Sequence, residues 1–172
     1  TMEIAKIIFK KAPNVWTASL LTTDKNKTLE IIKNEHYFCV DEYFYGKTRP
    51  FVETFVCEHP VYKWAKCFDL KHDPDIYLNM SLQALKEAMR KQPKFLRTIR
   101  HNKHPVIMNP SYADSFEEYR ILGAKRLSQR ASKIKNNKEF KDKVLLILKE
   151  EAEEKELLKS QEDRYNEESI YK

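Results

Sequence analysis

The sequence predicts an α+β fold, in which a small antiparallel β-barrel or curved sheet is flanked by helices on both sequence sides. Apolar residues recur at helical spacing before residue 36 and again after residue 115. Between them, residues 37–70 are rich in aromatic and β-branched side chains, with turn signals at Tyr45-Gly46-Lys47 and His59-Pro60. At 172 residues the chain can bury a core without a disulfide or a metal.

Three helices are predicted before the sheet. The first covers residues 1–10 and begins without capping residues, as though a longer helix had been cut. Pro13 suits the first turn of the second helix, and Asp24 can serve as the N-cap of the third. Their apolar residues are Ile4, Ile7 and Ile8, then Val15, Trp16, Leu20 and Leu21, then Leu29, Ile31 and Ile32.

Residues 37–70 are predicted to form three antiparallel strands of ordinary length. The clearest alternation lies in residues 61–70, the last of these runs. One side of that run carries Tyr62, Trp64, Phe68 and Leu70, and the other carries Lys63, Ala65 and Asp69. Asp73-Pro74-Asp75 then ends the strand pattern.

The second half of the chain is predicted to be mainly helical. Ser81 caps a helix whose core face is Leu82, Leu85 and Met89. Residues 95–102 return to strand character, and residues 105–108 add a short further strand. Ser115 and Glu118 have the spacing of a capping box, and Gly123 suits the end of that helix.

From residue 124 to residue 159 the chain is predicted to be helical, with a cap or kink at Asn136-Asn137. The last long helix buries an apolar stripe formed by Phe140, Val144, Ile147 and Leu148. Beyond Glu150 the segment is acidic and poor in large apolar groups. It is expected to be a solvated helix end that leads into a linker.

The net charge and the cysteines narrow the classes of protein to which this chain could belong. The formal net charge of +6 favours an anionic partner, nucleic acid first and a membrane surface or an acidic peptide next. No apolar run approaches the roughly 20 residues that span a bilayer, so no membrane role is expected. Cys39, Cys57 and Cys67 are odd in number and lie in apolar or aromatic runs. Reduced, buried thiols in a cytoplasmic protein explain them best.

The residues predict no complete active site, no metal site and no cofactor. Carboxylates are scattered, and Asp73 and Asp75 around Pro74 fit a capped turn better than a metal cradle. His101 with His104, and Cys57 with His59, are too few donors for zinc. The only two glycines are isolated, which excludes a glycine-rich phosphate loop, and no Ser or Cys lies in a nucleophile motif.

Two basic segments are the candidate nucleic-acid sites. No acidic residue occurs between Glu87 and Asp114. The candidate phosphate-binding residues of this first segment are Arg97, Arg100, His101, Asn102 and Lys103. An edge strand kept soluble by charge is an equally good interpretation. The second segment is residues 125–143, where basic residues recur at helical spacing. This cationic stripe could track a phosphate backbone, engage an acidic peptide or simply face solvent. Its candidates are Lys125, Arg126, Arg130 and Lys133.

The order of segments resembles the middle of bacterial exonuclease I. The resemblance lies in residues 61–75, in the stretch IRHNKHPV at residues 99–106, in Leu122-Gly123 before a basic helix, and in residues 135–144. It implies an SH3-like barrel with helical additions. Residues 1–12 would end the last helix of an upstream exonuclease domain, and residues 13–150 would form the SH3-like domain. Residues 151–172 would be an acidic helix end or linker toward a C-terminal helical domain.

The resemblance also implies a function. The family degrades single-stranded DNA 3′→5′ with Mg²⁺, in DNA repair and recombination, and its catalytic residues would precede Thr1. This chain would be a non-catalytic fragment that positions single-stranded DNA. The family binds the acidic tail of single-stranded DNA-binding protein, and Lys135, with Lys25 and Lys27, matches basic positions of the family. The alternative is a stand-alone SH3-like adaptor for an acidic protein partner; the missing carboxylate cluster disfavours a complete small nuclease.

Overall fold

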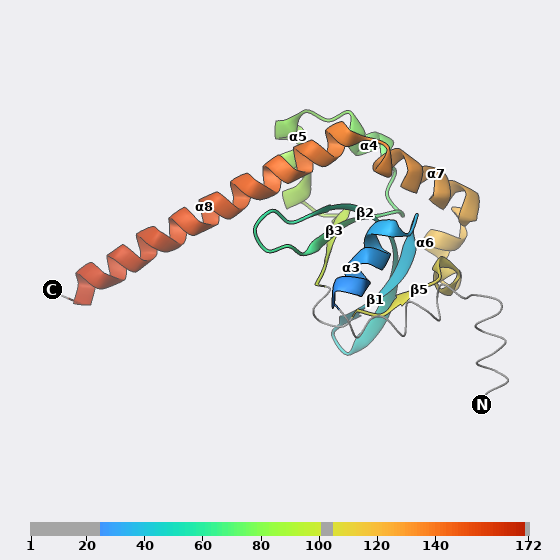
Figure 1. Ribbon diagram of the computed structural model, residues 1–172, viewed down its shortest axis with the longest axis horizontal. Coiled ribbons are helices and arrows are strands. Elements are labelled where there is room, and N and C mark those ends of the chain that lie inside the picture. Colours follow the sequence, from blue (N-terminus) through green and yellow to red (C-terminus); the bar gives the residue numbers. More distant parts are fainter. Residues whose placement is uncertain (1–24, 101–104, 171–172) are drawn as a thin grey trace.

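The computed structural model describes residues 25–100 and 105–170, which form six α-helices and a five-stranded antiparallel sheet. This confirms the α+β prediction, with a curved sheet that is not closed into a barrel (Figure 1). The helices are α3 (Lys25–Asn34), α4 (Asp75–Leu78), α5 (Leu82–Arg90), α6 (Glu117–Arg120), α7 (Gly123–Lys135) and α8 (Lys138–Ile170). The strands are β1 (Phe38–Phe44), β2 (Lys47–Glu58), β3 (Ala65–Asp69), β4 (Leu96–Ile99) and β5 (Ile107–Met108). A 3-10 helix, η2 (Pro110–Ala113), follows β5.

The sheet has the order β4-β3-β2-β1-β5. A hairpin joins β1 to β2, with Phe44 opposite Lys47. Its two turn residues, Tyr45 and Gly46, have φ values of 47° and 82°, which is the left-handed backbone that tight hairpins require. The predicted turn at Tyr45-Gly46-Lys47 is therefore confirmed. The strand β2 is long enough to pair with β1 on one side and β3 on the other, and a bulge lies between Phe55 and Cys57.

The third strand starts later than the alternation predicts. It begins at Ala65, and residues 61–64 belong to the preceding turn. The His59 ring fixes that turn, since its Nδ1 accepts hydrogen bonds from the amides of Val61 and Tyr62, both at 3.1 Å. The backbone of Lys63 has φ 62°, which no strand residue adopts. The prediction of a strand through residues 61–64 is wrong because a local side-chain turn competes with pairing.

Buried side chains cover both faces of the sheet. On one face, Ile32 of α3 packs with Phe51, Cys67, Ile99 and their neighbours. On the other face, the larger cluster joins β2 and β3 to α5, α7 and α8. Its residues include Phe68, Leu70, Leu85, Leu127, Phe140, Val144, Ile147 and Leu148. The apolar stripe predicted for the last helix is therefore buried, as expected.

The helix ends agree only in part with the predicted caps. The Ser81 hydroxyl accepts a hydrogen bond from the Ala84 amide at 3.2 Å, as predicted. The predicted capping box at Ser115 is wrong, because Phe116 is the N-cap of α6 and makes no side-chain cap bond. Gly123, at φ +72°, separates α6 from α7. The predicted break at Asn136-Asn137 divides α7 from α8, and Asn137 Oδ1 accepts from the Phe140 amide at 2.8 Å.

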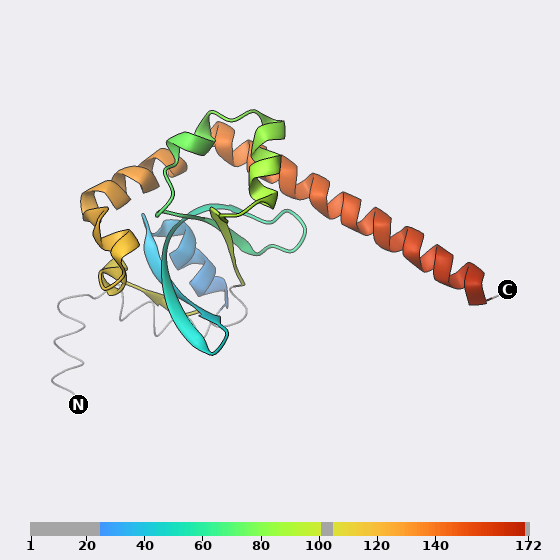
Figure 2. The same ribbon diagram turned by 180° about the vertical axis from the view of Figure 1, so that it is seen from behind.

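The helix α8 is longer than predicted and ends at Ile170 rather than near Lys159. Its first half packs on the body, and residues 153–168 are exposed as an arm that projects from the sheet (Figures 1 and 2). Salt bridges from α5 hold its base: Lys86 contacts Glu150 and Glu154, and Arg90 contacts Glu151 and Glu154. No helix within residues 25–100 and 105–170 is long and apolar enough to cross a bilayer.

Several predictions fall outside the described residues. These are the helices at residues 1–10 and after Pro13, the upstream boundary at residues 1–12, and the site residues His101, Asn102 and Lys103. The three cysteines are described, and all are buried free thiols, as predicted. Burial, with repulsion from Asp41 and Glu53, raises the pKa of the Cys39 thiol to about 12. Such a thiol stays protonated and unreactive at neutral pH.

Candidate nucleic-acid interface

The first predicted cation, Arg97, is directed inward from β4. Its guanidinium carbon lies 3.8 Å from the centroid of the Phe51 ring. Nε donates to both carboxylate oxygens of Glu42, at 3.1 and 3.2 Å, and lies 4.0 Å from Glu53 Oε1. Only 17% of the side chain is exposed. Arg97 therefore links the buried Glu53 and Phe51 to Glu42 nearer the surface, and most of its side chain is shielded from solvent.

Arg100, at the end of the same segment, is exposed and held by stacking. Its guanidinium carbon lies 4.6 Å from the Trp64 ring centroid. Trp64 stacks on Tyr62 with centroids 4.7 Å apart, and Tyr62 in turn lies 4.6 Å from His59. This ladder fixes the guanidinium plane while leaving its N–H groups able to reach a phosphate.

The cations predicted on α7 fall into two groups, one exposed to solvent and one held in contacts with the rest of the fold. Lys125 and Arg126 are exposed and form no ion pair within the described part of the chain. Arg130 instead donates to the carbonyl oxygens of Leu70 and Lys71, at 2.9 and 3.0 Å, and so ties α7 to the end of β3. Lys133 pairs with Asp75 at 2.8 Å. The helical stripe is thus partly a set of structural contacts.

The predicted tail-binding lysines lie around α3 and the end of α7. Lys135 Nζ donates to the backbone carbonyls of Lys33, at 3.4 Å, and Glu35, and burial lowers the pKa of its ammonium. Lys27 is exposed on α3. Lys25 begins that helix, and its side chain lies outside the described residues. Lys135 therefore bridges α7 to the segment that follows α3.

The structure gathers a set of cations that the sequence reasoning missed. They line a cavity of about 1020 Å³ beside the β1–β2 hairpin, here termed the Phe51 cavity. Its titratable lining residues are Lys47, Arg49, Lys71, His72, Lys94 and Arg97. Among the described residues, no Asp or Glu lines it. Tyr45 and Phe116 supply aromatic rings at this cavity.

Three of these cations surround one aromatic ring. Besides Arg97, the Arg49 guanidinium carbon lies 5.7 Å and the Lys71 Nζ 5.5 Å from the Phe51 centroid. Phe51 is 4% exposed, because it also packs in the core cluster with Ile32, Cys67 and Ile99. Cation–π attraction at such distances contributes about 0.5–1 kcal/mol each at partly exposed sites. It offsets some of the mutual repulsion of the cations.

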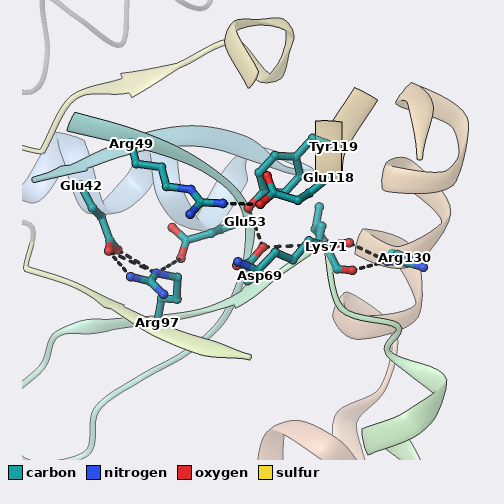
Figure 3. A network of polar contacts seen from close by, with 10 residues as sticks. Glu42, Arg49, Glu53, Asp69, Lys71, Arg97, Glu118, Tyr119 and Arg130 are labelled. Carbon is teal, nitrogen blue, oxygen red and sulfur yellow. Dashed lines mark hydrogen bonds and ion pairs between the residues drawn. The ribbon is translucent and has the colours of Figure 1, made fainter. Parts of the chain in front are cut away.

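Carboxylates behind the ring offset more of that repulsion. Figure 3 shows Glu42 and Glu53 beside Arg97, Asp69 beside Lys71, and Glu118 beside Arg49. Lys71 Nζ lies 3.5 Å from Asp69 Oδ2, and the Tyr119 hydroxyl donates to Asp69 Oδ1 at 2.8 Å. In the same view Arg130 lies on the far side of Asp69 and Lys71 from Arg97. Arg97 of β4 and Arg130 of α7 therefore approach the turn that follows β3 from two sides.

Glu53 and Asp69 are a buried acidic pair. They are direct partners in the β2–β3 register, and both are fully buried. Neither oxygen of Glu53 has a hydrogen-bond partner among the described residues. Burial, followed by repulsion from Glu42 and Asp69, raises the pKa of the Glu53 carboxyl well above its usual range, against an opposing effect of Arg97. Folding therefore favours the protonated form of the Glu53 carboxyl.

The sequence carried little signal for the Phe51 cavity. Arg49, Lys71 and Lys94 are isolated basic residues in three separate segments, and only the sheet and the loop after α5 bring them together. Arg97 was identified, but as a strand-face cation. A hint was available in Lys47, Arg49 and Lys71, which adjoin predicted strand ends, where side chains from neighbouring strands meet.

The sequence predicted no metal site at three groups of residues, of which His101 with His104 lies outside the described part of the chain. The Asp75 amide donates to Asp73 Oδ1 at 3.0 Å, so this pair forms the predicted capped turn. His59 binds backbone amides through Nδ1, as described above. Within the described ranges, no group of three or more His, Cys, Asp or Glu side chains has the arrangement of a metal site.

Comparison with solved structures places this geometry in a known fold. The metal-free complex of E. coli exonuclease I with single-stranded DNA matches with a TM-score of 0.59 at 18% identity, over 86% of this chain and 35% of that one. The fold is exonuclease I-like. The moderately thermophilic exonuclease I from Methylocaldum szegediense matches over the same shares, with a TM-score of 0.58 at 17% identity. An exonuclease I complex with SSB-Ct matches with a TM-score of 0.57 at 16% identity, over 85% of this chain and 34% of that one.

The chain thus spans about a third of the exonuclease I structures that it matches. No protein-family model matches the sequence, and no curated protein sequence matches it. At this level of identity the likeness extends to the fold. The resemblance identified in the sequence is therefore supported as an exonuclease I-like fold.

Proposed function

We propose that this chain is the non-catalytic, DNA-positioning part of an exonuclease I-like nuclease, which degrades single-stranded DNA 3′→5′ during repair and recombination. The carrying observation is the exonuclease I-like fold, which extends over 86% of the chain and is shared with a complex containing single-stranded DNA. Mg²⁺-dependent hydrolysis would belong to another domain of that nuclease. The domain division at residues 12 and 150 forms part of the same proposal.

The cations of the described surface support a phosphate-binding role. Arg100, Lys125 and Arg126 are exposed, and the Phe51 cavity adds a second group of positive charge. Cations that contact successive phosphates release condensed counterions, which makes binding strong at low salt and weak at high salt. Arg130 and Lys133 contribute positive charge nearby, but their geometry makes them chiefly structural.

We further propose that the region of Lys135, with Lys25 and Lys27, docks the acidic tail of single-stranded DNA-binding protein. The support is the likeness to an exonuclease I complex with SSB-Ct. A tail of this kind needs ammonium groups for its carboxylates beside an apolar pocket for its last side chain. Lys135→Ala should weaken binding of an acidic, Phe-ending peptide severalfold. An unchanged affinity would remove Lys135 from this site.

Fluorescence anisotropy with a labelled oligothymidylate tests the DNA role. The purified chain should bind at low salt, lose affinity steeply at moderate salt, and leave the oligonucleotide intact with Mg²⁺ present. The double variant Lys125→Gln/Arg126→Gln should lower affinity about tenfold, since each cation removed from a phosphate costs about 1 kcal/mol or less. Lys155→Gln/Lys159→Gln, exposed on the acidic arm, is the matched control and should bind as the parent does.

The same assay decides between the two functional classes. Absence of oligonucleotide binding at either salt concentration, together with binding of an acidic peptide, would favour a stand-alone adaptor for an acidic protein. Cleavage by the purified chain that a chelator abolishes would contradict the non-catalytic role. Binding with no cleavage supports the proposal as stated.

A further inference from the structure

The Phe51 cavity combines clustered positive charge, an unsatisfied buried donor and aromatic rings. We propose that it is a specific site for one phosphate group of a single-stranded nucleic acid, with the adjoining base against the ring of Tyr45 or Phe116. The source of the phosphate rests on the proposed function. The preference of the cavity for an anion rests on its own residues.

The charge distribution around the cavity favours an anion over a cation or a neutral ligand. Five Lys or Arg side chains line it, and within the described residues no carboxylate does so. Of the carboxylates that pair with these cations, Glu53 and Asp69 are fully buried in the sheet, whereas Glu42 and Glu118 are partly exposed beside Arg97 and Arg49. Lys47 and Lys94 are exposed and form no ion pair within the described residues, so their ammonium groups can receive an anion.

Two buried polar atoms in the lining lack partners, which is the second observation. Arg49 Nε and His72 Nε2 are both buried, and neither has a hydrogen-bond partner among the described residues. Arg49 already uses its Nη2 on Glu118. The other side of the His72 ring differs, since the imidazole already hydrogen-bonds the Lys94 backbone, and burial is the largest cause of its lowered pKa. A buried donor without a partner is rare, and a phosphate oxygen would satisfy the Arg49 Nε–H.

The aromatic rings favour a ligand that carries a base. Tyr45 stands fully exposed at the hairpin tip, held there by its left-handed backbone. Phe116, the partly buried N-cap of α6, also lines the cavity. Stacking of a base on an aromatic side chain contributes about 1–3 kcal/mol. The volume of about 1020 Å³ is ample for one nucleotide.

The experiment compares Lys71→Gln/Lys94→Gln with the control Lys155→Gln/Lys159→Gln, which changes the charge equally. Oligothymidylate binding by the cavity variant should fall about tenfold at low salt, and the slope of log affinity against log salt should fall by about 0.7, as expected for one single-strand phosphate. Lys94→Gln alone should give a smaller loss without removing the Lys71–Asp69 pair. Matching melting temperatures check that each variant is folded.

Location is tested by photo-cross-linking to an oligonucleotide that contains 5-bromodeoxyuridine. A cross-link to the peptide bearing Tyr45 or Phe116 supports the site. Parent-like affinity in both cavity variants, with cross-links elsewhere, overturns the inference but leaves the proposed function standing. Failure of the parent chain to bind any oligonucleotide contradicts both.

Thymidine 5′-monophosphate and an acidic peptide serve as competitors to identify the source of the anion. Competition by the mononucleotide only at concentrations far above those of the oligonucleotide supports a strand phosphate. Equal potency of the mononucleotide would overturn the strand assignment in favour of a free-nucleotide site. Displacement by the peptide with no effect of thymidine 5′-monophosphate would overturn it in favour of a protein partner.

Discussion

The helix α7 and the Phe51 cavity contain the same residue types in opposite situations. On α7, Arg130 and Lys133 are engaged by backbone carbonyls and by Asp75 on the side that meets the body. In the cavity, Lys71, Arg97 and Arg49 also have carboxylate partners, but those partners lie behind or beside the opening. The position of the counter-charge, rather than the density of Lys and Arg, decides which cations can receive an anion.

Among the substitutions that test this comparison, we expect the largest change in stability at Arg130. Arg130→Ala should lower the free energy of unfolding by about 2–3 kcal/mol, because the carbonyls of Leu70 and Lys71 lose a charged donor. Urea unfolding measures the loss, and Lys125→Ala on the same helix should change stability by no more than about 0.5 kcal/mol. Affinity for an oligonucleotide, measured on folded protein, should stay within about twofold. A tenfold loss of affinity with unchanged stability would make Arg130 a binding residue after all.

Tyr119 tests the polar network behind the cavity. Tyr119→Phe removes the hydrogen bond to the buried Asp69 and should cost about 1–2 kcal/mol. Because Asp69 also holds Lys71, oligonucleotide affinity should fall modestly as well, by about two- to threefold. Stability measured by urea and affinity measured by anisotropy should therefore change together. Loss of stability with parent-like affinity would separate the network from the cavity.

Glu53 gives the stability a distinctive pH dependence. Its carboxyl has a raised pKa in the folded chain, so the native state binds more protons than the unfolded state as pH rises past the usual carboxyl range. Stability should then fall as pH rises from the usual carboxyl range upward through the raised folded pKa. The groups that face Glu53 are Glu42, Cys39, Cys67, Asp69, Tyr119 and Arg97.

Glu53→Gln should remove this part of the pH dependence, because the amide does not titrate. Thermal melts of both proteins across that pH range measure the difference, which should grow toward the alkaline end. Glu118→Gln, at the exposed end of the network, is the control and should preserve the wild-type slope. Identical slopes for the parent and Glu53→Gln would show that Glu53 ionises normally.

The smallest effect is expected at the exposed pair of Lys133 and Asp75. Lys133→Ala should change stability by less than about 0.5 kcal/mol, as is usual for an ion pair in which both side chains are about half exposed. Its effect on oligonucleotide affinity should be less than half that of Lys94→Ala, when both are measured by anisotropy at one salt concentration. Equal losses would mean that binding responds to total charge and not to the cavity.

The sequence by itself determined most of the secondary structure. Local signals sufficed for the Tyr45-Gly46 hairpin, the Ser81 cap, the Asn136-Asn137 break and the buried stripe of α8, because turn backbone, capping and amphipathic periodicity act within a few residues. It failed at Val61 and Ser115. At Val61 the turn centred on His59 overrides the alternation, and at Ser115 the cap bond is not formed.

Tertiary structure alone decided what each cation does. Arg97 and Arg130 are both basic residues at plausible spacing, but one lies over Phe51 and the other donates to the backbone carbonyls that follow β3. Arg49, Lys71 and Lys94 meet only because β2, the end of β3 and the loop before β4 border the same cavity. Electrostatic interactions act through space between residues distant in sequence, so a charge pattern along the chain cannot specify their partners.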